Sequence, residues 1–590
     1  MTKDKIFNWK FCLCCGIFIW FIVNLLQGIF TEIQEDEAYY ALYGEHLAWG
    51  YFDHPPMVGL MTYLSSIFFS GTLGVRLFTI LASCLSLFVI WLIAISRPFD
   101  PSSGLRDRSL RDLDPKNIFL FFIIACSIVM FNIYGFVTTP DTALILFSAL
   151  FLFVYQRYLN DNSWKNALLM GVMMALMIYS KYHAFLLLGL IVLSNLKLLK
   201  DGKFWVACLL ALALLTPHIL WQVNHDFPSF RYHLTQRSES FRWSYFMEYL
   251  PNQLLIFNPF TFGAVVYVLC IDSRHRTSQR GNDMHSKLVF ERGLRFILIG
   301  FFFFFWLMAF RGHVEPHWTI VCVIPMVVLV YRKALVDEKL KKYIKWLVLP
   351  SLLLVLTFRI LLVTSFADRF GYHGKESYYR AIEQVAGDCP VVFQGSFQQP
   401  SLYHYFTGKE SAALKSYYDR TTQFDLWQFD KDWIGKPVFV CSPYHKLSKN
   451  YQINGIDFKG FMAEHFLSAN RLVTSFRITN ADGSDTPIFH HGDTILVDFS
   501  IHNPYDQAVD FHHPEFDLCI KAQYLLTDDF GYCRYDDIGF IHAHETYHGH
   551  LSTVVGDDIM VGNNRFTLGI GDGISSFVTE ESKMNIRIEP

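Results

Sequence analysis

Six acidic residues and no lysine or arginine lie between residues 31 and 74. A side-chain carboxylate can accept the proton of an attacking hydroxyl, orient a substrate, or bind a metal ion. An acidic first turn of a helix on the membrane surface is the structural alternative, because the helix macrodipole favours negative charge there. The six acids are Glu32, Glu35, Asp36, Glu37, Glu45 and Asp53.

Other ionisable residues adjoin long apolar runs in the first 364 residues. Asp141 directly follows Pro140, Arg76 stands near the start of one run, and Lys181 interrupts another. Ionisable groups at membrane depth are costly and therefore indicate function. Carboxylates beside cations are the pattern expected of a site for an anionic, lipid-linked substrate. A further group of such residues consists of Arg311, His313, Glu315 and His317.

The composition indicates that membrane-spanning helices position these side chains. Of the 590 residues, 52% are hydrophobic and only 17% are charged, and uncharged runs of about 20 residues match the thickness of a bilayer core. The net charge of -3 argues against a nucleic-acid binder. We predict a polytopic α-helical membrane protein with about eleven spans. They are expected at 11–30, 75–96, 117–136, 142–157, 167–180, 183–196, 204–221, 252–271, 296–310, 318–331 and 346–364.

The distribution of basic residues predicts the orientation in the membrane. The stretch 167–196 is divided at Lys181, because a single helix of that length would exceed the bilayer. With a cytoplasmic N-terminus, the inner loops then hold 25 lysines and arginines and the short outer loops hold 5. We therefore expect a multi-pass protein of the inner membrane, with residues 31–74 and the C-terminal domain on the periplasmic side.

Residues after 364 have the composition of soluble protein. We predict three domains: a membrane domain at 1–364, a small α/β domain at 365–445 and a β-sandwich at 446–590, both latter domains extracytoplasmic. Four cysteines in an oxidising compartment allow disulfides, and proximity along the chain suggests Cys389–Cys441 and Cys519–Cys533.

Two sets of residues suggest a metal site. His313, Glu315 and His317 have side chains that suit zinc, although a polar turn before a helix that begins at Pro316 explains them equally. No cofactor is certain, and a divalent metal is possible. The stretch 542–550 contains HExxH, which binds zinc only on a helix. Alternating β-branched and aromatic residues predict a strand and a turn there instead.

The order of these motifs resembles a known family. Asp36-Glu37 after the first span, Asp53-His54-Pro55-Pro56, Pro140-Asp141 and Lys181-Tyr182 together are similar to the GT-C membrane glycosyltransferases. Within them, the pattern resembles the glycosyltransferase family 39-like group of protein O-mannosyltransferases and aminoarabinose transferases, over roughly residues 30–330. His54 stands where the aminoarabinose transferases carry lysine and the mannosyltransferases carry histidine.

The resemblance implies an inverting transfer of a sugar from a polyprenyl-phosphate donor to an acceptor hydroxyl on the periplasmic side. The acceptor would be a glycolipid, a glycan or a protein, in the synthesis of cell-envelope glycan, lipopolysaccharide or glycoprotein. Asp36 maps to the general base, and Glu37, Asp53 and Asp141 would orient the base or the acceptor, or bind a metal. The donor phosphate needs cations. The candidates are Lys181, Arg76, His54, Arg311, Arg231 and Arg237.

A membrane transporter or lipid flippase with an extracytoplasmic binding domain is the alternative function. Transporters place ionisable groups near the middle of the bilayer, in broken helices related by a repeat. In this chain the acids gather in one outer loop and no inverted repeat is evident. A surface-binding protein anchored by its spans is a third class, and it would not need carboxylates at the membrane face.

Overall fold

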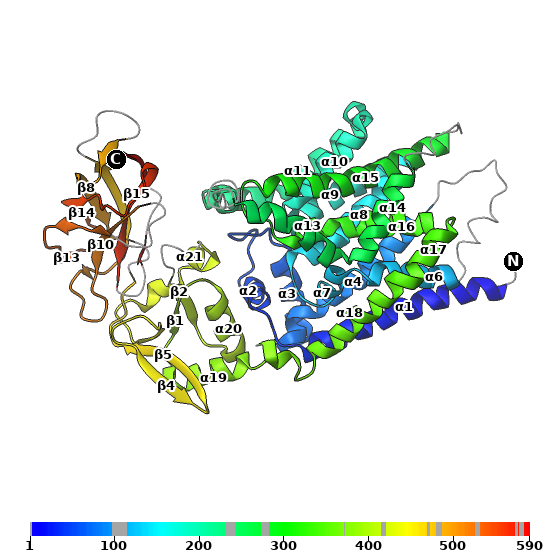
Figure 1. Ribbon diagram of the computed structural model, residues 1–590. Helices are drawn as coiled ribbons and strands as arrows, with labels where there is room; N and C mark the ends of the chain where they lie inside the picture. Colours follow the sequence, from blue (N-terminus) through cyan, green and yellow to red (C-terminus); the bar gives the residue numbers. More distant parts are fainter. Residues whose placement is uncertain are drawn as a thin grey trace. The chain divides into compact units, whose positions relative to one another are not determined.

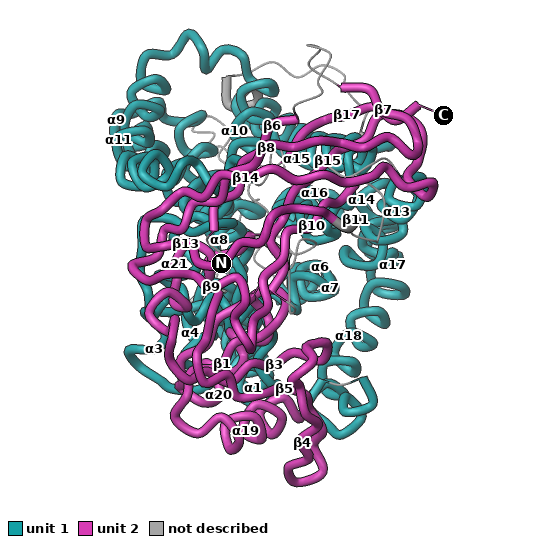
Figure 2. Tube along the Cα trace, turned by 90° about the vertical axis from the view of Figure 1, so that its left-hand side faces the viewer, with its two compact units in different colours: residues 1–373 teal, residues 374–590 magenta. Residues whose placement is uncertain are grey.

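In the computed structural model the chain divides into two compact units, residues 1–373 and 374–590 (Figure 2). Each unit has a hydrophobic core of its own. The first unit ends a few residues beyond the predicted end of the membrane domain at 364. The structure describes residues 3–96, 115–231, 242–272, 282–370, 372–414, 421–468, 472–478, 487–524, 531–572, 576–577 and 583–589.

Helices make up the regular structure in the described part of the first unit (Figure 1). Short 3-10 or π turns join some of them, at Leu196–Lys200, Pro316–Cys322, Ile344–Val348 and Ala367–Phe370. The helices are α1 (Lys3–Phe30), α2 (Glu35–Glu45), α3 (Met57–Phe68), α4 (Gly71–Ile95), α6 (Pro115–Cys126), α7 (Val129–Ile133), α8 (Pro140–Asn160), α9 (Trp164–Ser180), α10 (His183–Ser194), α11 (Gly202–Asn224), α12 (Pro228–Arg231), α13 (Trp243–Phe257), α14 (Pro259–Asp272), α15 (Asn282–Met308), α16 (Val323–Ala334), α17 (Glu338–Tyr343) and α18 (Leu349–Leu362).

Six helical stretches in the described residues are long and apolar enough to cross a membrane, or seven if α13 and α14, which bend by 100°, form one span. Four shorter apolar helices accompany them. Each of the eleven predicted runs falls on one or two helices. The predicted polytopic helical architecture is therefore confirmed, while the number of eleven spans stays a prediction.

Lys181 separates α9 from α10, where the sequence predicted a break. Helix α9 packs closely against α11 (Figure 1). Gly171 of α9 allows this approach, since a Cβ atom built on it would lie 2.6 Å from the carbonyl oxygen of Ala207. Small residues let membrane helices come this close.

The second unit begins with helices α19 (Lys375–Ala386), α20 (Gln398–Thr407) and α21 (Gln423–Trp427) and a five-stranded sheet of order β2-β1-β3-β5-β4. Strand β1 is parallel to β2 and β3, whereas β5 is antiparallel to β3 and β4. This sheet extends beyond residue 446, where the sequence suggested a domain boundary. The strands are β1 (Val391–Gln394), β2 (Ser411–Leu414), β3 (Val438–Cys441), β4 (Lys449–Ile453) and β5 (Ile456–Ala463).

The remaining strands form a six-stranded, a four-stranded and a two-stranded sheet, which contribute to one hydrophobic core, as predicted for a strand-rich domain. One has the order β11-β10-β15-β17-β7, with β16 beside β15; the other has the order β12-β14-β8-β6. Strands β9 and β13 pair separately. Their bounds are β6 (Val473–Ile478), β7 (Ile488–His490), β8 (Thr494–His502), β9 (Val509–Asp510), β10 (Cys519–Tyr524), β11 (Gly531–Tyr532), β12 (Arg534–Tyr535), β13 (Phe540–Ile541), β14 (Thr546–Val554), β15 (Gly562–Gly571), β16 (Ser576–Phe577) and β17 (Lys583–Glu589).

The predicted disulfides are wrong, because Cys389, Cys441, Cys519 and Cys533 are all free thiols. Cys441 pairs with Phe393 in the parallel register of β1 and β3. Cys389 precedes Phe393 by four residues, about 13 Å along an extended chain, beyond the reach of a disulfide. Burial raises the pKa of the Cys533 thiol to about 12, which makes it unreactive.

The close contact of α9 with α11 predicts a difference between two glycine substitutions. Gly171→Ala should lower the unfolding free energy by about 1–3 kcal/mol, because its methyl group meets the Ala207 carbonyl. Gly189→Ala is the matched control, since a Cβ there has no neighbouring atom within 4 Å. Thermal unfolding of the purified protein in detergent measures both. Equal melting temperatures would refute the close contact.

The second unit should lose stability in mild acid. His445 is buried and stacks on Phe461, with ring centroids 4.4 Å apart, and burial lowers its pKa below the ordinary 6.5. The unfolded chain then binds a proton near pH 6.5 while the folded chain does not. The stabilising contribution is full above that pH and decreases as the pH falls.

The unfolding temperature of the second unit in the intact chain, measured from about pH 7 to pH 5, tests this. His445→Phe keeps the stacking and should flatten the decrease. Replacing the exposed His548 of β14 with asparagine should leave the decrease as it is. An identical pH dependence in His445→Phe and the unmutated protein would contradict the assignment.

Candidate active site

Helix α2 begins with an acidic turn that separates an exposed carboxylate from a buried one. Glu35, Asp36 and Glu37 form this turn, as expected from the helix macrodipole. Asp36 is exposed, whereas Glu37 is fully buried. Neighbouring side chains on a helix point about 100° apart, so one can face the protein while the other faces outward.

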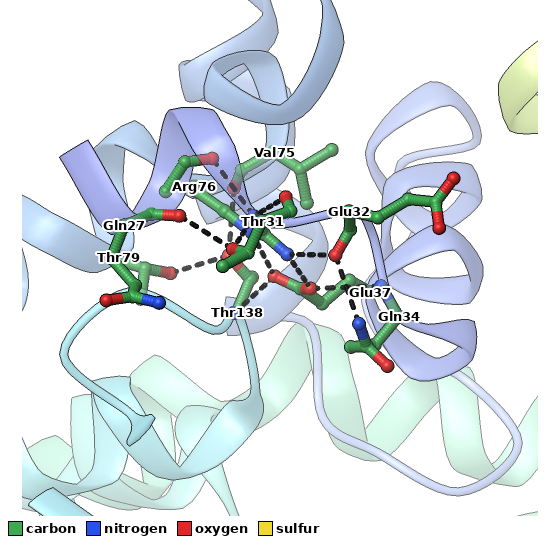
Figure 3. Close-up of polar contacts among 10 residues, drawn as sticks. Gln27, Thr31, Glu32, Gln34, Glu37, Val75, Arg76, Thr79 and Thr138 are labelled. Carbon is green, nitrogen blue, oxygen red and sulfur yellow. Dashed lines mark hydrogen bonds and ion pairs between the residues drawn. The ribbon is translucent and has the colours of Figure 1, made fainter. Parts of the chain in front are cut away.

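An ion pair between Glu37 and Arg76 holds this turn in place (Figure 3). Arg76 Nε donates to Glu37 Oε1 at 2.8 Å, and the same oxygen accepts the backbone N–H of Thr138 at 2.9 Å. The other guanidinium nitrogens donate to Glu37 and to backbone carbonyls, including those of Gly28 and Thr31. One buried charge pair thus joins α1, α2, α4 and the chain before α8.

This geometry corrects two predicted roles. Arg76 was a candidate for the donor phosphate, but its guanidinium has 0% exposure and each of its nitrogens already donates to the protein. Glu37 was a candidate catalytic residue, but its carboxylate is equally inaccessible. In this arrangement both side chains are fully buried and bond each other and the surrounding protein. Both hold α2 and therefore position Asp36.

A second buried pair lies where α8 begins. Pro140 occupies the first turn of α8, and Asp141 follows it. Lys181 Nζ donates to both carboxylate oxygens of Asp141, at 2.7 and 2.9 Å. His317 Nε2 lies 3.8 Å from Asp141 Oδ2, and its side chain is 27% exposed against 3% for Asp141. The pair thus forms an inner layer, and His317 lies nearer the surface.

Tyr134 connects this pair with the exposed acids. It is largely buried, and its ring centroid lies 6.1 Å from that of His317. Asp141, Asp36 and Glu315 all act electrostatically on its hydroxyl. The structure therefore brings together residues from the first loop, the start of α8, the α9–α10 break and the turn before α16, as the sequence predicted.

Asp53 lies in a neighbouring hydrogen-bonded network. The Tyr43 hydroxyl donates to Asp53 Oδ1 at 2.6 Å. Burial and the Asp53 charge raise the pKa of Tyr43 well above its ordinary value, so Tyr43 stays a neutral donor. Tyr43 also stacks on Tyr51, with ring centroids 3.8 Å apart. Asp53 interacts electrostatically with Tyr182, the residue after Lys181.

Helix α11 contributes residues that sequence reasoning missed. His218 bridges the carbonyl of Trp49, 2.6 Å from Nδ1, and the Tyr182 hydroxyl, 3.0 Å from Nε2. Gln222 donates to Tyr182 and to Ser229. The spacing of His218 and Gln222 places both on one face of an otherwise apolar helix, a signal that was available in the sequence.

Arg359 of α18 was also missed, although a charged residue in an apolar run is itself a signal. Its guanidinium is buried and donates to the side-chain oxygens of Gln27, Asn132 and Asn24. It also lies over the ring of Phe136, which Arg76 approaches as well. The chain segment that carries Tyr134 and leads to Asp141 is thus held by two arginines.

The other predicted phosphate ligands have more accessible positions. His54 is partly exposed and contacts the ring of Tyr40 at 5.6 Å between centroids. Arg311 and Arg231 are exposed. Arg237 lies outside the described residues.

The predicted metal site does not form in the described residues, where no three histidine, cysteine or acidic side chains are arranged to hold a metal ion. His313 lies 3.8 Å from Glu315, whereas His317 turns toward Asp141. This divergence contradicts the proposed ligand set of His313, Glu315 and His317. His544-Glu545 of the HExxH sequence lies in a turn before β14, as predicted, and not on a helix.

Comparison with known proteins supports the fold and the resemblance. Residues 108–221 match the family model of dolichyl-phosphate-mannose-protein mannosyltransferase. The matched segment includes Asp141 and Lys181. A comparison with curated protein sequences finds no match.

Solved structures with a similar fold include ArnT from Cupriavidus metallidurans. The apo form aligns with a TM-score of 0.52 at 13% identity, over 76% of this chain and 97% of that chain. The form bound to undecaprenyl phosphate aligns with a TM-score of 0.52 at 15% identity, over the same shares of 76% and 97%. The resemblance to GT-C membrane glycosyltransferases is thereby confirmed at the level of the fold.

The Glu37–Arg76 pair predicts a rescue experiment. Arg76→Met should lower the unfolding free energy by about 3–5 kcal/mol, because the Glu37 carboxylate is left buried without its partner. Adding Glu37→Gln removes that charge while keeping an acceptor for Thr138, and it should restore a large part of the stability. Thermal unfolding in detergent measures both. A double variant as unstable as the sum of the single variants would refute the coupling.

Proposed function

We propose that this chain, which has the GT-C fold, is an integral membrane glycosyltransferase that moves a sugar from a polyprenyl-phosphate donor to an acceptor hydroxyl. One observation carries the proposal: exposed Asp36, on the helix that a buried ion pair holds, acts on the same tyrosine, Tyr134, as Asp141, which Lys181 and His317 approach. The ArnT structure with undecaprenyl phosphate supports a lipid phosphate as the partner.

Asp36 is the general base in this proposal. Its carboxylate takes the proton of the acceptor hydroxyl while the acceptor oxygen bonds to the anomeric carbon of the sugar. The bond from that carbon to the phosphate oxygen breaks, and the polyprenyl phosphate leaves with the electron pair. Single displacement inverts the anomeric configuration. The base must be accessible and fixed in position, and Asp36 is exposed on a helix that Glu37 and Arg76 hold.

In this proposal the leaving phosphate is bound by cationic side chains that are exposed to a lipid headgroup. Arg76 is excluded by its burial, and Lys181 is engaged with Asp141. His54, Arg311 and Arg231 are partly or fully exposed and can approach a lipid headgroup. Asp141 and Asp53 are buried and engaged with Lys181 and Tyr43, so in this proposal they hold the surrounding side chains in position.

The basic residues support the proposed location. The predicted inner loops carry 25 lysines and arginines and the short outer loops carry 5, which supports a cytoplasmic N-terminus and residues 31–74 outside an inner membrane. Transfer then takes place on the periplasmic side, and the second unit lies there too. The acceptor in this proposal is a glycolipid, a glycan or a protein of the cell envelope.

Asp36→Asn tests the assigned base. Because asparagine cannot accept the proton, we expect the transfer rate to fall by about 10²- to 10⁴-fold with an unchanged melting temperature. The readout is mass spectrometry of envelope glycolipids and glycoproteins from cells with the protein, without it, and with the variant. The modified class of molecule identifies the acceptor.

Glu35→Gln is the matched control, because it removes a carboxylate from the same helical turn. This variant should retain transfer. A near-normal rate in Asp36→Asn would exclude Asp36 as the base. Envelopes that are identical with and without the protein would exclude the glycosyltransferase function itself.

A further inference from the structure

A buried hydroxyl at the start of α8 has no hydrogen-bond partner. Thr139 precedes α8, is 9% exposed, and its Oγ1 is buried without any partner in the protein. A threonine in this position ordinarily bonds a backbone N–H in the first turn of the helix, but the Thr139 side chain makes no such bond. An unsatisfied buried hydroxyl costs free energy, so this group requires an explanation.

The neighbouring threonines are all satisfied. Thr138 Oγ1 donates to the carbonyl of Val75 at 3.0 Å and lies 2.9 Å from Thr79 Oγ1, both on α4. Thr142 Oγ1 donates to the carbonyl of Tyr134 at 3.1 Å. Thr139 has an extended backbone, with φ -145 and ψ 161. Successive side chains alternate in extended chain, which puts the Thr139 side chain on the other side of the backbone from that of Thr138.

The chemistry around this hydroxyl favours a neutral, polyhydroxylated ligand. Asp141 lies two residues further along the chain, and its charge is balanced by Lys181. Asp36 and Glu315 also act on the nearby Tyr134, and Lys181 is engaged by Asp141, so these surroundings favour an uncharged ligand over a phosphate. A sugar ring suits it better, since its hydroxyls can donate to a carboxylate and both donate to and accept from a threonine.

We infer that Thr139 is a specificity-determining residue that hydrogen-bonds a hydroxyl of the donor's sugar ring. The inference rests on the proposed function, in which the donor is a polyprenyl-phosphate sugar. The bound sugar supplies the partner that Oγ1 lacks in the protein alone. A site with a buried polar group that expects a hydroxyl rejects a ligand without one.

Thr139→Val removes the hydroxyl and keeps the shape of the side chain. The probes are undecaprenyl phosphate alone and undecaprenyl phosphate carrying mannose or aminoarabinose, bound to the full-length protein in detergent. For whichever sugar lipid the unmutated protein prefers over the bare lipid, Thr139→Val should lower the affinity about tenfold. Its affinity for bare undecaprenyl phosphate should not change. Thr139→Ser, which keeps the hydroxyl, should retain the preference.

Ser148→Ala is the matched control, because Ser148 also lies in α8 and its buried hydroxyl also lacks a partner. It stands nine residues further along, about 13 Å by helical rise, and should change neither affinity. If Thr139→Val is poorly folded, Thr139→Ala replaces it in the same assay.

Three results would overturn the inference. A Thr139→Val variant that keeps the full preference for the sugar lipid shows that the hydroxyl makes no contact with the sugar. A protein that binds the bare lipid as tightly as both sugar lipids has no such contact to lose. Failure of the unmutated protein to bind any of the three lipids overturns the proposed function as well, and this result is distinct from the first two.

Discussion

The arrangement of the site depends on the compensation of charge inside a membrane protein. Glu37 and Arg76 are both inaccessible, and each would be very costly alone in an apolar interior. Together they attach the start of α2 to α1 and α4 and to the backbone of Thr138. Breaking this pair would release the turn that presents Asp36 and the segment that leads to Asp141, so two parts of the site share one anchor.

The same principle recurs with different partners. Asp141 is neutralised by Lys181, whereas Arg359 is surrounded by amide oxygens and aromatic rings. The buried charges thus serve positioning, and the residues nearer the surface are available for chemistry. Asp36, His317 and Glu315 belong to the residues nearer the surface, and the buried charged residues hold the elements that carry them. It also explains why the site depends on residues far apart in the sequence.

Several residues of the candidate site could be predicted from the sequence, because charged residues are rare in apolar runs and their order is informative. Asp36, Asp141 and Lys181 were predicted in this way, whereas His317 was predicted as a metal ligand and instead lies beside Asp141. The sequence did not reveal which charged side chains form ion pairs with one another. Arg76 was therefore predicted to bind the donor phosphate, although it pairs with Glu37. Uncharged apolar runs located α8 and α9, but nothing local indicated that β4 and β5 continue the sheet of β1–β3. Strand pairing is a long-range property, and so is the register that separates Cys389 from Cys441.

The contacts of Arg359 also constrain how the protein is made. Its partners Asn24 and Gln27 lie 335 and 332 positions earlier in the chain, in α1. Until α18 is synthesised, the amide oxygens that α1 offers to Arg359 have no guanidinium to bind. The segment that carries Tyr134 therefore gains its second arginine only when α18 has packed against it.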